Sequence, residues 1–238
     1  MRPGTHGLCL LAIASIPGVA AALTFDGDLG YTSDYIHRGV SESASHGAGQ
    51  LDLRIDTADG SFAGVFATSL GRVRTGWSRH GWDAILQTYL GHQFALSPTW
   101  SATLTAVNYS YLGGNVSGSN DYQELSLAMS YLDRWTVTVA ATPDAVRWNG
   151  PYRLGRYAAY TTDTSLQVPI YRRLFFVGGA GYYFSDDTGY LYGNAGLALE
   201  ISNLRIEADY IAAQERAETL FSYARAGSRY ALTALWHF

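Results

Sequence analysis

The chain has 238 residues, of which 15% are charged and 14% aromatic, whereas about 25% are charged in an ordinary soluble domain. Its mean hydropathy is −0.04, which excludes a bundle of transmembrane helices, and the low charge with many aromatic residues excludes a disordered chain. The net charge is −4 and the chain has no lysine, which argues against a nucleic-acid-binding protein.

The N-terminus has the pattern of a secretory signal peptide. Arg2 precedes an apolar stretch from Leu8 to Val19, and the small residues Ala20 to Ala22 offer a cleavage site. The alternative is a cytosolic N-terminal helix, which the prolines of this segment suit poorly. We therefore predict a signal peptide over residues 1–22 and a single β-barrel over residues 23–238.

From residue 23 onward, apolar and polar residues alternate with period two in twelve successive segments. Most segments have about ten residues, the length of a tilted transmembrane strand, whereas strands of soluble sandwiches usually have about five or six. The alternation alone fits both classes of protein, but the segment length and number favour a barrel. In chain order, the segments cover residues 23–31, 50–56, 61–70, 83–94, 100–111, 124–131, 135–142, 157–168, 174–184, 194–201, 204–210 and 229–238.

The connections between these segments alternate in length. Short links alternate with longer ones, and the longer ones cover residues 71–81, 113–121, 143–154 and 213–227. All six prolines are expected in the leader, turns or loops, where they remove no ladder hydrogen bond. The pattern predicts an all-β, up-and-down, 12-stranded antiparallel transmembrane β-barrel with both termini on the periplasmic side. Its last strand ends in the aromatic Phe238, as expected of a substrate of the barrel assembly machinery.

One segment carries a family resemblance. Ser33-Asp34-Tyr35-Ile36-His37-Arg38-Gly39-Val40-Ser41-Glu42-Ser43 resembles the opening signature of a proteobacterial porin family, called the TorF or Gcw_chp family. Gly60-Ser61-Phe62-Ala63-Gly64-Val65-Phe66-Ala67-Thr68-Ser69 resembles a later segment of the same family. The resemblance covers about residues 23–135 and implies a porin in the outer membrane of a Gram-negative bacterium.

The alternation points an excess of acidic residues into the lumen. The eleven inward acids are Asp26, Asp28, Asp34, Asp52, Asp56, Asp83, Glu124, Asp163, Glu200, Glu207 and Asp209, and the four inward arginines are Arg38, Arg54, Arg205 and Arg229. As pore-lining candidates we take Asp34, Arg38, Asp52, Arg54, Asp56, Asp83, Glu124, Asp163, Arg205, Glu207 and Asp209. Acidic linings favour cations in a pore. The alternative is a plugged lumen whose charges are paired or hydrated.

Arg38 is the most specific candidate for a functional residue. It follows the first predicted strand and stands before a loop rich in Gly and Ser. Pointing inward, it would pair with Asp34 or Glu124 and narrow or gate the lumen. The alternative is an ion pair that only satisfies buried charges inside a small barrel.

The longer loops carry further arginines. They are Arg72, Arg74, Arg79, Arg147, Arg153, Arg156, Arg216 and Arg225. Because arginine binds phosphate bidentately, outer-membrane lipids and lipopolysaccharide are expected partners. Ordinary solvated loop charge is the alternative.

Three classes of function remain. The leading prediction is passive diffusion of small polar solutes, with a preference for cations. The second is a closed structural or surface-interaction barrel. A lipid-modifying enzyme is the third, because Ser41, Ser43, His37 and His46 lie close together in sequence, but such groupings are common in loops. We predict no catalytic residue, cofactor, metal or nucleic-acid partner; the one cysteine, Cys9, lies in the leader.

Overall fold

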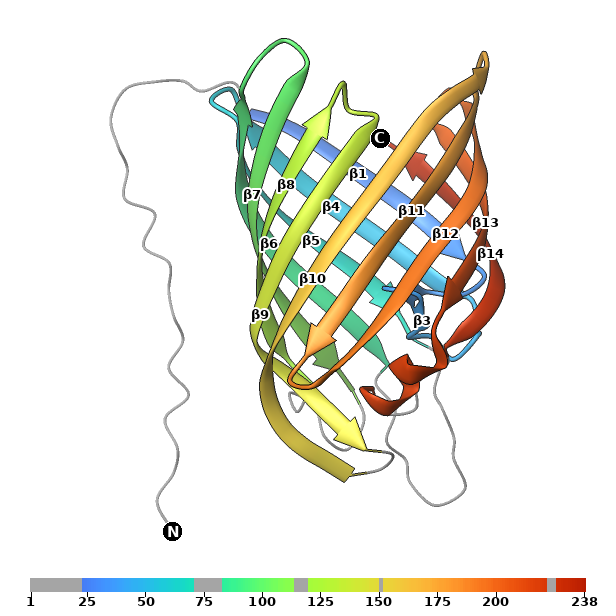
Figure 1. The fold of residues 1–238 in the computed structure, drawn as a ribbon. Coiled ribbons are helices and arrows are strands. Elements are labelled where there is room, and N and C mark those ends of the chain that lie inside the picture. Colours follow the sequence, from blue (N-terminus) through green and yellow to red (C-terminus); the bar gives the residue numbers. More distant parts are fainter. Residues whose placement is uncertain (1–22, 71–82, 114–119, 150–151, 222–225) are drawn as a thin grey trace.

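The computed structural model describes residues 23–70, 83–113, 120–149, 152–221 and 226–238. Within these ranges, twelve antiparallel strands close into a barrel (Figure 1). They are β1 (Leu23–Thr32), β4 (Ala48–Thr57), β5 (Ser61–Ser69), β6 (Ala84–Ala95), β7 (Trp100–Leu112), β8 (Tyr122–Tyr131), β9 (Trp135–Asn149), β10 (Tyr152–Tyr171), β11 (Leu174–Ser185), β12 (Thr188–Ile201), β13 (Leu204–Ala213) and β14 (Gly227–His237). A separate two-stranded sheet joins β2 (Ile36–His37) to β3 (Val40–Ser41), and the short 3-10 helix η1 (Glu215–Thr219) precedes β14.

The two ends of the barrel differ. The links of two to four residues between β4 and β5, β6 and β7, β8 and β9, β10 and β11, and β12 and β13 lie at one end, which we call the turn end. The start of β1 and the end of β14 lie there too, and the opposite end, which holds η1, is the loop end (Figure 1). The predicted up-and-down barrel, with both ends of its strand order on the same side, is confirmed.

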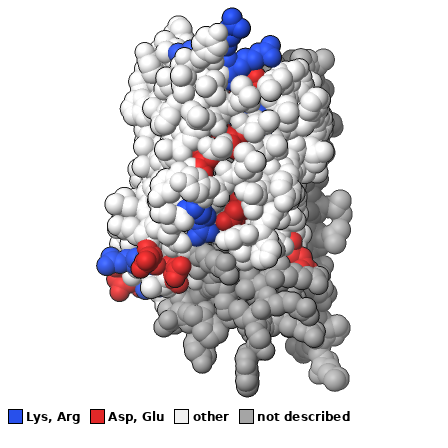
Figure 2. Space-filling view, turned by 90° about the vertical axis from the view of Figure 1, so that its right-hand side faces the viewer, with Lys and Arg blue, Asp and Glu red and all other residues white. Residues whose placement is uncertain are grey.

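The outer wall is apolar. Leu29, Leu125 and Leu197, each in a different strand, have about half or more of their surface exposed. In each of these strands, the residues that alternate with the exposed apolar ones point inward. On the face shown in Figure 2, charged atoms gather mainly toward the ends and only small charged areas lie at mid-height. So much exposed apolar surface is unfavourable in water and suits the hydrocarbon of a membrane.

Aromatic residues mark the turn end of this wall. The rings of Trp100 and Tyr131 lie 5.0 Å apart, and those of Trp100 and Trp135 lie 6.4 Å apart. All three side chains are exposed on the outer wall. Such rings form the interfacial girdle of transmembrane barrels. No helix in the described part of the chain is long and apolar enough to span a membrane.

The predicted positions of two prolines and one loop are wrong. Pro143 lies inside β9 and Pro169 inside β10, and much of the predicted loop 143–154 is an extension of these two strands. The registers are irregular opposite Ala158, beside Pro143, and again after Pro169. At such a bulge a residue is left out of the ladder, so proline costs no hydrogen bond there. The predicted loop 71–81 lies outside the described residues.

The wall has one weakly paired seam. β1 pairs with β4 over ten residues but with β14 over only five, from Asp28 to Thr32. Beyond Thr32 the chain leaves the wall, and Ser33 alone continues the contact through two hydrogen bonds of 2.9 Å to the backbone of Leu232. The segment that leaves the wall at this seam enters the lumen.

Candidate functional site

A short excursion of the chain fills the loop-end half of the lumen. Residues 33–47, which we call the inner hairpin, leave the wall after Thr32, fold back through β2 and β3, and rejoin it at Ala48. Thr32 and Ala48 are register partners in the β1–β4 ladder, so the excursion begins and ends at one point of the wall. The sequence predicted only a loop here, because two strands of two residues carry no periodic signal.

The reversal of the inner hairpin requires left-handed backbone. Arg38 has φ +51° and Gly39 has φ +77°, the signs that a tight two-residue hairpin turn needs. A Cβ at Gly39 would lie 2.7 Å from the Cβ of Tyr192 and 2.8 Å from that of Ala213. Glycine is therefore required both for conformation and for close contact with β12 and β13.

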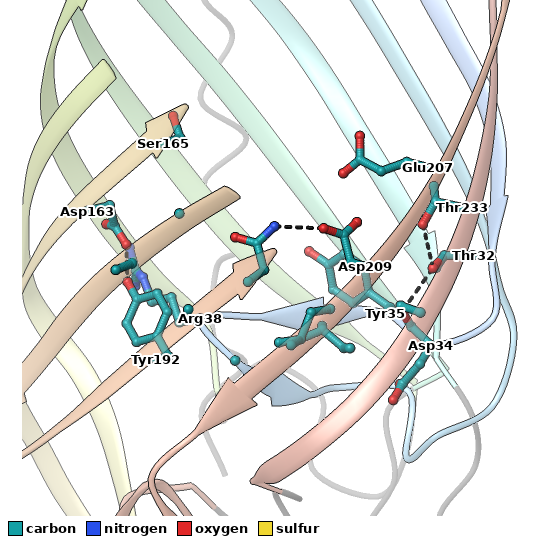
Figure 3. Close-up of a pocket in the computed structure, with 18 of the residues that line it drawn as sticks. Thr32, Asp34, Tyr35, Arg38, Asp163, Ser165, Tyr192, Glu207, Asp209 and Thr233 are labelled. Atoms are coloured by element: carbon teal, nitrogen blue, oxygen red, sulfur yellow. Dashed lines mark hydrogen bonds between the residues drawn. The ribbon is translucent and has the colours of Figure 1, made fainter. Parts of the chain in front are cut away.

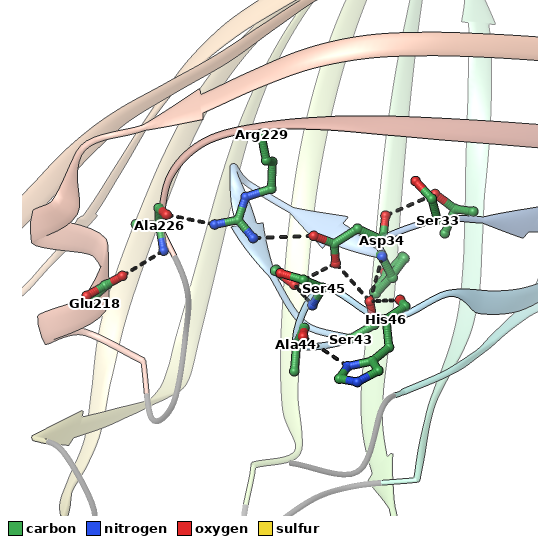
Figure 4. A network of polar contacts seen from close by, with 12 residues as sticks. Ser33, Asp34, Ser43, Ala44, Ser45, His46, Glu218, Ala226 and Arg229 are labelled. Atoms are coloured by element: carbon green, nitrogen blue, oxygen red, sulfur yellow. Dashed lines mark hydrogen bonds and ion pairs between the residues drawn. The ribbon is translucent and has the colours of Figure 1, made fainter.

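Asp34 holds the base of the inner hairpin (Figure 4). Its Oδ1 accepts hydrogen bonds from the hydroxyls of Ser41 at 2.6 Å and Ser43 at 2.8 Å, and its Oδ2 forms an ion pair with Arg229 of β14 at 3.3 Å. The Ser43 oxygen also accepts the backbone N–H of Tyr35 at 2.8 Å. Asp34, Ser41 and Ser43 are buried, so this network replaces the water that a charged carboxylate would lose.

Arg38 anchors the tip of the inner hairpin to the wall. Its guanidinium donates to Glu124 of β8 at 2.6 Å, and its backbone carbonyl accepts the hydroxyl of Tyr190 of β12 at 3.1 Å. Thr142 donates a further hydrogen bond to Glu124 at 3.0 Å. In the ring of strands β8 is fifth from β1, so the side chain of Arg38 reaches nearly the opposite wall, while the backbone of the tip lies against β12 and β13. Of the two acids considered for Arg38, Glu124 is its partner and Asp34 belongs to Arg229.

Aromatic and apolar side chains seal the inner hairpin on both sides at the loop end. One cluster comprises Val40, Ala145, Ala159, Tyr183, Tyr190, Ala217 and Leu220. The other comprises Ile85, Tyr109 and Tyr111, against which Tyr35 and Tyr122 pack. The ring of His37 stacks on Tyr109 at 5.8 Å between centroids. Within the described residues, the inner hairpin thus contacts the walls on opposite sides of the barrel.

Burial shifts the pKa values of two side chains of the inner hairpin, His37 and Glu42. It lowers the pKa of His37 to about 3, with a smaller contribution from the charge of Arg38, so His37 is neutral. It raises the pKa of Glu42 to about 7. The inner hairpin therefore carries one carboxyl group that titrates near neutral pH.

The lumen is open on the other side of the inner hairpin. A cavity of about 380 Å³ lies between the inner hairpin and the wall formed mainly by β10 to β14. Figure 3 shows Asp163 beside Tyr192 and Arg38, and Asp209 across the cavity near Glu207. Asn194 donates to Asp209 at 2.8 Å, and the hydroxyl of Tyr192 donates to Asp163.

A second cavity of about 610 Å³ lies nearer the turn end. Asp26, Asp28, Asp52, Arg54 and His237 contribute its polar lining. Tyr89 donates to Asp52 at 2.7 Å, and His237 lies 3.3 Å from Asp28. We call the two cavities together the vestibule.

The pore-lining candidates divide into three groups. Asp34, Arg38, Asp163, Glu207 and Asp209 line the cavity beside the inner hairpin. Asp52 and Arg54 line the cavity at the turn end. Asp56, Asp83, Glu124 and Arg205 line neither cavity. Asp56 pairs with Arg54 at 2.5 Å, and Arg205 pairs with Glu200 at 2.8 Å and Glu207 at 2.7 Å.

Sequence reasoning missed the neutral lining. Tyr192 and Asn194 on β12, Gln50 on β4 and Thr233 on β14 line the inner cavity. The alternation places these four residues on the inward face of their strands, but only charged residues were taken as pore-lining candidates.

The loop arginines have varied surroundings. Arg147 pairs with Asp186 at 2.8 Å and Asp187 at 3.2 Å, and Arg156 pairs with Asp144 at 3.1 Å. Arg216 lies in η1. Arg72, Arg74, Arg79 and Arg225 lie outside the described residues, as does the side chain of Arg153. Lipopolysaccharide binding by these residues stays a prediction.

The serine and histidine residues of the inner hairpin do not form a catalytic triad. Ser41 and Ser43 donate to Asp34, and the ring of His46 contacts the carbonyl of Ala44. Among the described residues, no group of three or more His, Cys, Asp or Glu is placed to hold a metal ion.

The fold resembles solved outer-membrane proteins. The structure titled "KdgM porin" superposes with a TM-score of 0.51 at 11% identity, covering 90% of this chain and 99% of that one. The "NanC porin structure" superposes with a TM-score of 0.56 at 12% identity, covering 90% and 98%. Among curated protein sequences, none matches the chain significantly. At these identities the likeness concerns the fold alone.

A family model matches the sequence itself. The model described as "Bacterial protein of unknown function (Gcw_chp)" matches residues 17–233. The match includes the segment that forms the inner hairpin and nearly all of the barrel. This chain therefore belongs to the Gcw_chp family of bacterial proteins.

Proposed function

We propose that this protein is a porin of the Gram-negative outer membrane, as its resemblance to the TorF family implies. Small polar solutes would diffuse passively through its lumen. The observation that carries the proposal is the vestibule, a lumen of two cavities with polar linings inside a wall whose outer face is apolar. The fold shared with KdgM and NanC, both titled porins, supports it.

The charge balance of the vestibule favours cations. Each of the four inward arginines forms an ion pair with a carboxylate. Five inward acids have no arginine partner among the described residues: Asp26, Asp28, Asp52, Asp163 and Asp209. An excess of carboxylates inside low-dielectric walls gives a negative potential that attracts cations and repels anions.

Planar-bilayer recordings test the proposal. We expect current through the refolded protein, and a reversal potential under a KCl gradient that shows preference for K⁺ over Cl⁻. Replacing residues 33–47 by an Asn-Gly turn keeps the register of Thr32 with Ala48 and removes the inner hairpin. That variant should conduct more than the parent. Anion preference in both proteins would refute the electrostatic account.

A closed structural barrel is the second candidate. The observation that favours it is the inner hairpin, which the walls hold at base and tip by buried ion pairs. Absence of current in the variant without the inner hairpin would establish this alternative over the channel.

The last strand supports assembly into the outer membrane by the barrel assembly machinery. Phe238 exchanges two backbone hydrogen bonds with Gly27, at 2.9 Å and 3.1 Å, and so closes the seam at the turn end. Deleting Phe238 should leave secretion intact but lower the amount of folded protein in the outer membrane. Normal insertion of the truncated chain would contradict this role.

A further inference from the structure

The inner hairpin is attached to the barrel in a way that lets it move as a unit. It forms a sheet of its own and shares no ladder with the twelve strands. Because Thr32 and Ala48 face each other in the β1–β4 register, the whole excursion can leave the lumen without breaking a pair of the wall. Ser45, His46 and Gly47, at its return to the wall, are exposed.

Two buried ion pairs hold the inner hairpin at opposite ends. Arg38 and Glu124 pair at the tip with side chains 13% and 7% exposed, and Asp34 and Arg229 pair at the base with side chains 7% and 14% exposed. Removing one partner of such a pair is strongly unfavourable, because the other charge is left buried without compensation. Among the described residues, further side-chain hydrogen bonds to the wall join the Tyr190 hydroxyl to the Arg38 carbonyl, Gln87 to Tyr35, Thr32 to the Asp34 carbonyl, and the Leu232 N–H to Ser33.

The same segment separates the vestibule from the loop end. Arg38, Gly39 and Tyr35 line the inner cavity from one side, while Val40 is buried in the cluster on the other side. Displacement of the inner hairpin would therefore join the vestibule to the loop end.

We propose that the inner hairpin is a movable plug, seated by the Arg38–Glu124 and Asp34–Arg229 ion pairs, whose release opens the lumen. This inference rests on the proposed channel function and adds its regulation. The plug moves as one piece because the Asp34 carboxylate ties its two strands together through Ser41 and Ser43.

Thiol accessibility tests the movement without relying on current. Residues 23–238 contain no cysteine, so within them Val40→Cys introduces a single thiol, at a side chain that is 2% exposed. We expect this thiol to resist a charged methanethiosulfonate reagent in the otherwise unchanged protein. Adding Glu124→Gln should raise the reaction rate about a hundredfold or more, the factor that breaking a buried ion pair supplies.

Asp56→Asn is the matched control. Asp56 forms an ion pair with Arg54 inside the same lumen, and its register partner Thr24 lies near the start of β1, far along the ladder from the Thr32–Ala48 pair where the inner hairpin leaves. It should leave the reactivity of the Val40→Cys thiol unchanged. Ser45→Cys, at an exposed position of the inner hairpin, gives the rate of a fully accessible thiol.

Conductance of the same variants gives the second readout. Glu124→Gln should raise the open probability, and Asp56→Asn should not. Protection of the thiol in Glu124→Gln, or equal reactivity in the unchanged protein, overturns the plug. If the thiol becomes reactive but no variant conducts, the inner hairpin moves as proposed and the channel function is wrong.

Discussion

The loop-end and turn-end halves of the lumen are built on the same twelve strands but filled differently. At the loop end the inward positions of β7, β8 and β12 carry Tyr109, Tyr122 and Tyr190, which pack against the inner hairpin. Toward the turn end the inward positions combine charged or shorter side chains such as Asp52, Arg54 and Thr105 with the rings of Phe62 and Tyr89, and a cavity remains. The inner hairpin and the side chains packed on it, rather than the strand number, therefore decide where this lumen is filled.

The largest expected effect comes from Asp34→Ala. It removes the partner of Arg229 and the acceptor of two serine hydroxyls, so the seated inner hairpin should lose about 3–5 kcal/mol relative to the displaced form. The reactivity of the Val40→Cys thiol and the single-channel current measure this loss. Asp133→Ala, in a turn at the turn end, should change neither.

Tyr109→Ala tests whether aromatic packing closes the loop end. Tyr109 is 7% exposed, and its ring lies 4.3 Å from that of Tyr122. The truncation should lower the free energy of unfolding by about 3–5 kcal/mol and leave a cavity beside the inner hairpin. Tyr230→Ala, on the outer wall, is the control of the same residue type. Equal destabilisation by both changes, measured by urea unfolding in lipid, would contradict the packed interior.

Asp209→Asn probes the open half. The amide keeps an acceptor for Asn194 but removes one unpaired charge from the inner cavity. The ratio of K⁺ to Cl⁻ permeability should fall about tenfold, because one unit charge about 6 Å from an ion in water shifts the energies of K⁺ and Cl⁻ by about 0.7 kcal/mol each, in opposite directions. The change should shrink in about 1 M salt, where the screening length is about 3 Å. Asp209→Glu should keep the ratio of the parent.

A further expected effect is a pH dependence of the seated inner hairpin. Burial raises the pKa of Glu42 from 4.5 to about 7, so its stabilising contribution is complete below about pH 4.5 and is lost as the pH rises through 7. The seated inner hairpin should therefore be weaker at pH 8 than at pH 5, by about 1.4 kcal/mol for each unit of the shift. The titratable tyrosines Tyr35, Tyr111 and Tyr190 face this carboxyl group.

Thiol reactivity of Val40→Cys at the two pH values, divided by that of Ser45→Cys, measures this effect. Glu42→Gln should remove the pH dependence. A dependence that persists in Glu42→Gln would assign it to another group.

The wall could be predicted from the sequence because every strand repeats one signal. Leu51, Leu53 and Ile55 face outward as their alternation with charged residues required. Pro143 and Pro169 misled the prediction, because proline is compatible with a bulge inside a strand as well as with a loop.

The interior could be predicted only in part. Inward parity identified Arg38 and Glu124, but these residues are 86 positions apart, and nothing local distinguishes Glu124 from Asp34 as the partner. The inner hairpin depends on contacts with strands from β6 to β14, which no local pattern encodes. Which side chains pair across the lumen is decided only when the twelve strands have closed into a ring.

The seam beside β1 has a consequence for assembly. The strand that completes the ring is also the strand from which the inner hairpin departs, and Ser33 contributes both the last contact with β14 and the first step into the lumen. Arg229, on the opposite side of this seam, forms the ion pair with Asp34. Closing the ring thus also brings Arg229 beside Asp34, so a barrel caught before closure is one whose inner hairpin still lacks its base ion pair.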